Sequence, residues 1–384
     1  KGRPKTFQLH CHPGFLSSQP GTSRQTFHIP KQRAQGVHSL RRRRQISKGL
    51  DRFAAEGLRA DRMFTAAPQC VPSRTALMTG RMPVAVRMGR FSSPLPADVI
   101  TLPDLLKQAG YFTGVCRRQF HLDGPGAASN SSETLEKYGL KTFAKRLDFA
   151  DVSADRSKTG AIMNQFFDKK PANKPFFLWV NFNDPHHVWD ANAANPPYDP
   201  AKLPLPKHFP DLPGLREDFA KYLGEITRAD DEFKTVLDVV DKRGFAQNTL
   251  VIFMGDNGMA LPHGKGSLYD PGSNVPLLIR WPGVTRGGAT PPTPVITPDL
   301  HATVLDIAGA AQLFGHLADR QARRVLALDR RDHVPRLDPG LGGGTVVHRR
   351  DDLHHAAVGA DGQADARILA LGALAQIVVV GGRQ

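Results

Sequence analysis

Hydrophobic positions follow two different periods along the middle of the chain, and they predict alternating helices and strands. Uninterrupted apolar runs in KPFFLWVNFND (residues 174–184) and TLVIFMGDNG (residues 249–258) predict strands that are covered on both faces. A spacing of three and four predicts a long helix between them, with an apolar face of Leu223, Ile226, Phe233, Val236, Leu237 and Val240. This alternation is typical of an α/β fold, and we expect a mostly parallel, mixed sheet sandwiched between helices.

Glycine and proline mark where the flanking elements begin and end. The amphipathic segment LDRFAAEGLRA predicts a helix that ends near Gly57, and TLPDLLKQAG predicts another with Gly110 as its C′ residue. The run YFTGV that follows is expected to form a strand. A last helix is predicted in TPDLHATVLDIAGA, with Thr297 as N-cap, Pro298 at N1 and Gly309 as its stop.

Composition divides the chain into three segments. Residues 1–46 are rich in Arg, Gln, His, Ser and Pro and follow no sustained period, so we expect an irregular basic segment. Residues 47–310 carry the α/β pattern and form the expected main domain. Residues 311–384 contain no Lys, Glu, Tyr or Trp and are expected to be an irregular, atypical tail. The abrupt changes at both boundaries suggest the hypothesis that shifted reading frames, or decay of the gene, produced both ends around an authentic core. The alternative is a natural basic arm and tail.

Charge changes this picture little. The net charge is +15, but +11 of it lies in residues 1–50, so the rest of the chain carries only +4. The run Arg41 to Arg44 is the one feature that favours nucleic-acid binding, and no aromatic residue is interleaved with it, so we expect no nucleic-acid partner. No apolar run is long enough to span a bilayer, and the first residues show no secretory signal. Three scattered cysteines make no disulfide framework.

Polar side chains follow several of the predicted strands. Because ligands of such sheets bind beyond the carboxyl ends of the strands, we expect these side chains to converge at one edge. They supply carboxylate, amide, imidazole and ammonium groups, which together suit an oxyanion substrate. The residues concerned are His121, Asp184, His186, His187, Asp256, Asn257, His263 and Lys265.

The segment APQCVPSRTALMTGRMP (residues 66–82) adds a cysteine at the predicted start of a helix. Arg74 and Lys265 can neutralise a tetrahedral anion, and a helix N-terminus near Pro72 favours negative charge. In this electropositive setting we expect a lowered pKa for the Cys70 thiol. Asp256 and its neighbour Asn257 offer the hard oxygen atoms that Ca²⁺ or Mg²⁺ prefers. The short spacing from Cys70 to Arg74 argues against a phosphatase-type thiolate nucleophile.

These motifs resemble the sulfatase family. CVPSRTALMTGR matches its C-x-P-S-R-x-x-x-x-T-G-R signature, and FNDPHH, GDNG and HGKGSLYDPGSNVPLLIRWPG resemble further blocks in the same order. The resemblance covers about residues 47–310 and implies an alkaline-phosphatase-like fold and sulfuric ester hydrolase activity. It also implies that Cys70 is oxidised to formylglycine by a formylglycine-generating or sulfatase-maturing enzyme, which would recognise Pro72, Ser73 and Arg74.

The resemblance implies roles for the other polar residues. Asp256 and Asn257 resemble ligands of the divalent metal, Lys265 and His186 resemble the groups that hold sulfate and protonate the leaving oxygen, and His121 resembles the histidine beside formylglycine. The substrate would be a small-molecule or carbohydrate sulfate ester. A phosphodiesterase or phosphonate hydrolase of the same superfamily is the alternative activity, since its members can share the cysteine signature.

One departure from the family bears on the metal. Sulfatases resemble one another in opening with an apolar strand that ends in paired aspartates, and residues 1–46 contain no aspartate. We therefore expect an incomplete metal site in this chain, and an inactive sulfatase-like remnant is a further alternative. The CRRQFHLDG segment also departs from the usual lysine-containing pattern, and Arg118 is its candidate substitute.

Overall fold

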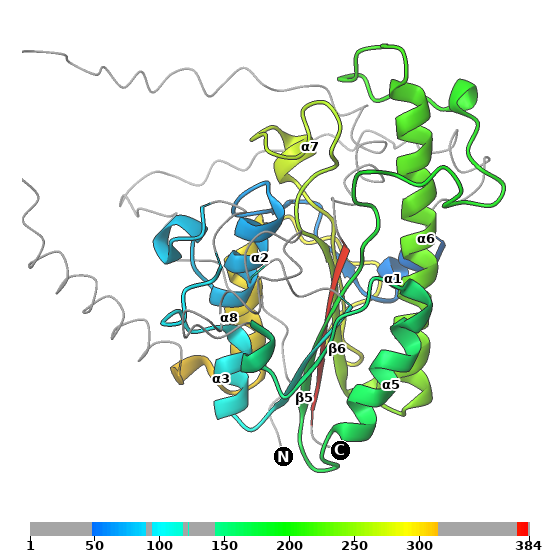
Figure 1. Cartoon of the computed structure of the whole chain (residues 1–384). Helices are drawn as coiled ribbons and strands as arrows, with labels where there is room; N and C mark the ends of the chain where they lie inside the picture. Colours follow the sequence, from blue (N-terminus) through cyan, green and yellow to red (C-terminus); the bar gives the residue numbers. More distant parts are fainter. Residues whose placement is uncertain (1–47, 90–93, 118–121, 123–142, 314–374, 383–384) are drawn as a thin grey trace, which may run out of the picture.

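The computed structural model describes residues 48–89, 94–117, 122, 143–313 and 375–382. Within these residues a seven-stranded mixed sheet has helices on both faces (Figure 1), which confirms the expected fold class. In order across the sheet, its strands are β1 (Leu58–Arg59), β7 (Leu277–Arg280), β6 (Thr249–Gly255), β9 (Ala375–Gly381), β5 (Phe176–Asn181), β3 (Phe112–Cys116) and β4 (Phe149–Asp151). Strands β2 (Met63–Phe64) and β8 (Val295–Ile296) pair separately, in parallel.

The helices form two layers. Helices α2 (Cys70–Thr79), α3 (Leu102–Gln108) and α8 (Thr297–Ile307) pack against one another on one face of the sheet. Helices α1 (Lys48–Glu56), α5 (Thr159–Lys169) and α6 (Leu215–Lys242) cover the other face. The short helix α7 (Asp270–Ser273) lies at the upper end of the molecule in Figure 1. None of the helices in the described ranges is both long and apolar enough to cross a membrane.

Strand β5 shows why the sheet needs both helical layers. Its side chains alternate between two separate cores: Phe176 and Leu178 pack with α5 and α6, whereas Phe177 and Trp179 pack with α2, α3 and α8. Every residue of β5 is buried, as every residue of β6 is. A strand buried on both faces has no polar side to alternate, which explains the continuous apolar runs in the sequence.

Strand β9 occupies the middle of the sheet, between β5 and β6, and is antiparallel to both. Its residues 377–380 are buried, and their side chains pack alternately into the two cores. We expected residues 311–384 to be irregular, and residues 375–381 differ from that expectation. The remainder of the tail up to residue 374 lies outside the described residues.

The helix ends predicted at Gly110 and Gly309 agree with the structure, whereas the predicted N-cap of the last helix is shifted by one residue. Gly110 follows the end of α3 with a φ of 89°, and Gly309 follows α8 with a φ of 67°, so both adopt the left-handed conformation that ends a helix. Thr297, predicted as N-cap, is instead the first residue of α8. The cap is provided by Asp299, whose Oδ2 accepts a hydrogen bond of 2.9 Å from the Ile296 N–H.

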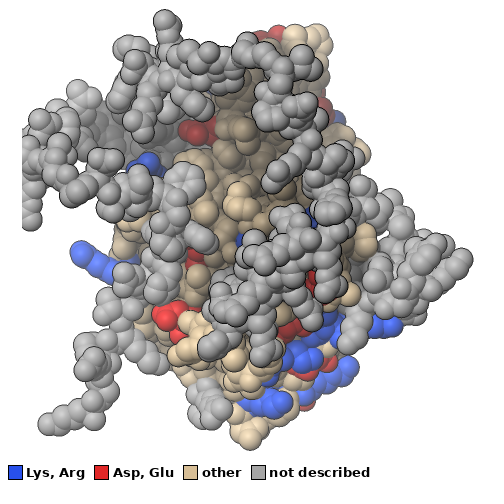
Figure 2. All heavy atoms as spheres, turned by 90° about the vertical axis from the view of Figure 1, so that its left-hand side faces the viewer, with Lys and Arg blue, Asp and Glu red and all other residues tan. Residues whose placement is uncertain are grey.

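The side of the molecule formed by α2, α3 and α8 is shown in Figure 2. Described Lys and Arg side chains gather towards the lower right of this view, with acidic side chains among them. Such intermixed charge is ordinary for a solvent-exposed protein surface. The arginine run Arg41 to Arg44 lies outside the described residues, so the absence of a nucleic-acid partner stays a prediction.

The fully buried His301 of α8 makes stability depend on pH. Its Nδ1 lies 3.1 Å from the Leu77 carbonyl oxygen, and burial lowers its pKa from the ordinary 6.5 to about 4. Between these values the unfolded chain binds a proton that the folded chain does not, so the free energy of unfolding falls as the pH drops from 6.5 to 4. A pKa difference of this size contributes about 3 kcal/mol.

Urea unfolding at a series of pH values checks this expectation. The His301→Gln variant should lose much of the slope between pH 6.5 and 4. The exposed His187→Gln variant should keep the wild-type slope. An unchanged slope in His301→Gln would show that other groups carry the pH dependence.

Candidate active site

Cys70 is the first residue of α2 and is buried, with a side chain that meets the loop after β6. The helix therefore begins two residues before Pro72, which sits in its first turn. Lys265 comes from that loop, and its Nζ donates a hydrogen bond of 2.8 Å to Cys70 Sγ. The loop is held in place by a 2.8 Å backbone hydrogen bond from the Gly266 N–H to the Pro68 carbonyl oxygen.

The prediction of a lowered pKa for Cys70 is wrong. Burial of the thiol is the largest influence and raises its pKa, and the negative charge of Asp256 raises it further. Lys265 and Arg74 lower it, but by less than burial and Asp256 raise it. The thiol is therefore a poor thiolate nucleophile in this form, because a thiol kept protonated by desolvation attacks slowly.

Arg74 links α2 to the ends of two central strands. Its Nε lies 3.1 Å from Asp256 Oδ2 just after β6, and its Nη1 donates a 2.8 Å hydrogen bond to Oδ1 of Asn181 at the end of β5. Its guanidinium carbon lies 5.6 Å from the centre of the Trp179 ring. Arg74 and Asp256 are both fully buried, so this ion pair is shielded from solvent. Asn181 was not among the sequence candidates, because it lies inside an apolar strand.

The two predicted metal ligands are adjacent and buried. Asn257 donates a 2.7 Å hydrogen bond from Nδ2 to the Gly258 carbonyl oxygen, while its Oδ1 is buried without a hydrogen-bond partner among the described residues. Such an acceptor suits a cation. Asp256, however, is already paired with Arg74. Across the described ranges no group of three or more His, Cys, Asp or Glu side chains is placed to hold a metal ion.

His186 follows β5 and lies in a neighbouring cavity. Its Nδ1 lies 2.5 Å from the His187 carbonyl oxygen, and it lines this cavity together with Asp184, Arg117 and Arg228. The described lining does not include Cys70, Arg74, Asp256 or Lys265. The structure thus joins Cys70 to Lys265 and Arg74 to Asp256 through direct contacts, and it places His186 in the lining of the cavity.

The remaining histidine and cysteine candidates divide as follows. His121 and Arg118 lie outside the described residues. The His263 ring, in the loop that carries Lys265, lies 5.1 Å from the Tyr269 ring and 6.2 Å from the His208 ring. Cys116 at the end of β3 is fully buried, and burial raises its pKa, as expected for a core thiol.

Comparison with known protein families shows to which family this chain belongs. The family model described as Sulfatase matches residues 31–310. The chain belongs to the sulfatase family. Human N-sulphoglucosamine sulphohydrolase is similar to this chain, with 28% identity over 67% of this chain and 55% of that protein. An ulvan-active sulfatase of Formosa agariphila is 24% identical over 69% of this chain and 48% of its own length.

Solved structures agree on the fold. A putative sulfatase of Bacteroides fragilis has a TM-score of 0.56 at 20% identity, covering 69% of each chain. A phosphonate monoester hydrolase of Silicibacter pomeroyi has a TM-score of 0.52 at 22% identity, covering 68% of each chain. At such low identities these matches show the fold alone. This sulfatase chain spans about half the length of the two curated relatives described above.

Proposed function

We propose that this chain is a sulfuric ester hydrolase that acts through a formylglycine formed at Cys70. The contact between Lys265 and Cys70 carries the proposal, because it puts a cation 2.8 Å from the atom that the modification replaces. The N-terminus of the ten-residue helix α2 adds partial positive charge at the same place. A sulfate ester bound here would meet two sources of positive charge at its anionic oxygens.

The formylglycine would supply the nucleophile, an aldehyde hydrate whose hydroxyl attacks sulfur and whose second hydroxyl allows sulfate to be released. Lys265 would neutralise the sulfate group as negative charge moves onto its oxygens. Arg74 would hold Asp256 and the first turn of α2 in register, since it joins both to β5. We assign protonation of the departing alcohol oxygen to His186 or His121, following their positions in the family motifs.

The described residues alone do not fit the divalent metal that the family resemblance implies. Ca²⁺ takes about six to eight oxygen ligands, and the described residues offer Asp256 Oδ and Asn257 Oδ1. Arg74 already neutralises the single negative charge of this pair. We therefore assign to Asp256 and Asn257 one part of a metal site only, and we derive no step through the metal.

We propose a carbohydrate sulfate as the substrate and a formylglycine-generating or sulfatase-maturing enzyme as the partner in maturation. The names of the curated relatives support the substrate class, since one acts on N-sulphoglucosamine and another is active on ulvan. The similarity to a phosphonate monoester hydrolase leaves a related activity to be tested beside it.

Sulfate release from para-nitrophenyl sulfate tests the proposal. The full chain is co-expressed with a formylglycine-generating enzyme, and mass spectrometry of the peptide containing Cys70 checks the modification. We expect sulfate release that is lost in Cys70→Ala. Higher efficiency on a matched aryl phosphodiester would replace this proposal with the phosphodiesterase alternative. Modified protein that releases neither sulfate nor phosphate would identify an inactive relative.

Removing Lys265 should slow the reaction strongly. In Lys265→Met we expect kcat for para-nitrophenyl sulfate to fall by about a hundredfold or more, as when one fixed electrostatic group of a buried site is lost. Lys221→Met is the matched control, because Lys221 forms a half-exposed pair with Asp218 on α6. Equal losses in both variants, or no loss in Lys265→Met, would remove Lys265 from the active site.

A further inference from the structure

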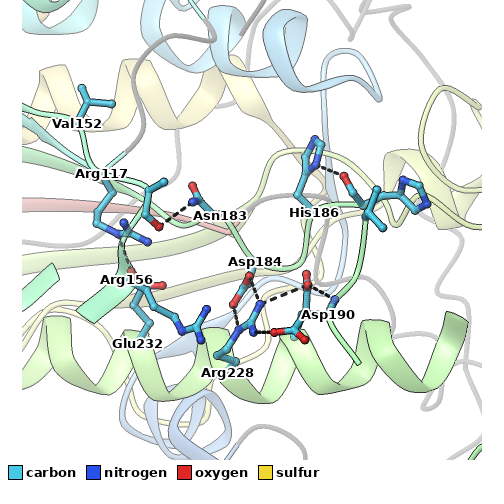
Figure 3. A pocket seen from close by; sticks show the side chains of 13 residues that line it. Arg117, Val152, Arg156, Asn183, Asp184, His186, Asp190, Arg228 and Glu232 are labelled. Carbon is cyan, nitrogen blue, oxygen red and sulfur yellow. Dashed lines mark hydrogen bonds and ion pairs between the residues drawn. The ribbon is translucent and has the colours of Figure 1, made fainter. Parts of the chain in front are cut away.

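A cavity of about 480 Å³ lies beyond the carboxyl ends of β3, β4 and β5 and reaches down to α6 (Figure 3). Cavities of this size accept small molecules. Most of the residues that line it are of polar type, and they combine arginine and carboxylate side chains, including Arg117, Arg156, Asp184, Glu225, Arg228 and Glu232. The sequence motifs place Asp184 among the polar residues expected at this edge of the sheet, and they assign no role to the other five.

One wall of the cavity is formed by Arg117, directly after β3. This side chain is fully buried, and its Nε lies 3.0 Å from Glu232 Oε1 on α6. The same oxygen accepts a 2.5 Å hydrogen bond from Thr159 Oγ1, and Arg117 Nη1 donates to the Ser153 carbonyl oxygen. Arg117 Nη2 is buried without a hydrogen-bond partner among the described residues. This wall therefore offers one unused charged donor.

A second part of the lining is organised by Arg228 on α6, one turn before Glu232. Its Nη2 lies 2.8 Å from Asp184 Oδ1, its Nε binds the other oxygen of that carboxylate, and its Nη1 lies 2.5 Å from Asp190 Oδ2 (Figure 3). Glu225, one turn earlier, accepts a 2.9 Å hydrogen bond at Oε1 from the Asp190 N–H. Its Oε2 is buried without a hydrogen-bond partner among the described residues. Burial raises the pKa of Glu225 to about 7, so its protonated and ionised forms both occur near neutral pH.

These walls restrict the chemistry of a ligand. A purely anionic ligand would lie against Asp184, Asp190, Glu225 and Glu232, and a purely cationic one against Arg117, Arg156 and Arg228. A ring carrying several hydroxyl groups avoids both conflicts, because each hydroxyl donates one hydrogen bond and accepts others. Such a ligand would form hydrogen bonds with Arg117 Nη2 and Glu225 Oε2 at once. Buried polar atoms that lack hydrogen bonds cost the folded protein free energy.

We propose that this cavity binds an uncharged, hydroxylated sugar ring of the substrate, with Arg117 and Glu225 as specificity-determining residues. The inference deepens the proposed function and rests on it for the identity of the sulfated group. The geometry of β5 connects the two sites: Asn181 binds Arg74, and Asn183, which lines the cavity, follows two residues later.

Binding of unsulfated glycosides tests the cavity without any catalysis. Saturation-transfer NMR and titration are carried out on the full chain with methyl glucoside, methyl galactoside and methyl N-acetylglucosaminide. We expect at least one of them to bind the wild type, and Glu225→Met to weaken that binding about tenfold. Arg156→Ala replaces an exposed residue of the cavity lining and should weaken glycoside binding about threefold. It therefore tests the cavity even if Glu225→Met does not fold. Glu217→Met, exposed on the same helix, should bind like the wild type.

Two outcomes separate this inference from the proposed function. If para-nitrophenyl sulfate is hydrolysed but none of the three glycosides binds, or Glu225→Met and Arg156→Ala both bind as the wild type does, the sugar site is wrong and the hydrolase stands. If a glycoside binds with the expected losses but no sulfate is released, the sugar site stands and the proposed activity is wrong. When both hold, Glu225→Met should lower kcat/KM for a sulfated glycoside by a larger factor than kcat/KM for para-nitrophenyl sulfate.

Discussion

Arg74→Ala is expected to lower the free energy of unfolding by about 3–5 kcal/mol, because it removes the guanidinium from a fully buried ion pair and leaves the Asp256 carboxylate in place. The same change takes away the hydrogen bond to Asn181 and the contact with the Trp179 ring. Chemical denaturation monitored by tryptophan fluorescence and circular dichroism measures the loss. Sulfate release should vanish together with it.

Two companion variants show whether the buried charge is the cause. Arg74→Ala combined with Asp256→Asn should recover part of the lost stability, since no buried carboxylate then remains at that position, yet it should recover no activity. Arg87→Ala breaks the exposed pair with Asp98 and should cost less than about 1 kcal/mol. A double variant as unstable as Arg74→Ala would point to lost packing as the origin of the effect.

Val378→Asp in the centre of β9 should prevent folding or cost more than about 4 kcal/mol. Its side chain is 1% exposed and packs in the core on the side of α2, α3 and α8, where a carboxylate finds no solvent. Val84→Asp is the matched control, because Val84 is 80% exposed and its replacement should leave stability within about 0.5 kcal/mol of the wild type. Thermal unfolding of both variants makes the comparison.

The outcome for Val378→Asp tests the assignment of β9 directly. Wild-type stability in this variant would mean that the sheet between β5 and β6 does not need residues 375–381 for its stability. Loss of stability in Val378→Asp but not in Val84→Asp would establish that this late segment completes the core.

Much of the fold follows from local patterns in the sequence. The buried strands β5 and β6 are visible as apolar runs, and the apolar face of α6 is visible as a helical period, because each depends only on neighbouring residues. The approach of Lys265 to Cys70 could be expected as well, since the residues that follow β6 lie at the edge of the sheet where α2 begins. Their chemical roles stay predictions.

Three features depend on distant parts of the chain and escape such an analysis. The run AQIVVVG reads as a short apolar segment, and nothing local in it indicates an antiparallel place between β5 and β6. Asn181 reads as the end of a buried strand, and its bond to Arg74 depends on how α2 is packed. The pKa of Cys70 was assigned from nearby cations, whereas burial of the thiol outweighs them.

The position of β9 has a consequence for synthesis. Its partners in the ladder are residues 176–181 and 249–255, which leave the ribosome long before residues 375–381 do. Until then β5 and β6 expose unpaired backbone edges and apolar side chains, the condition that makes nascent chains prone to aggregate. Contacts of such long sequence separation also slow folding. The yield of folded protein from cells should therefore rise with chaperone supply and with slower translation at lower temperature.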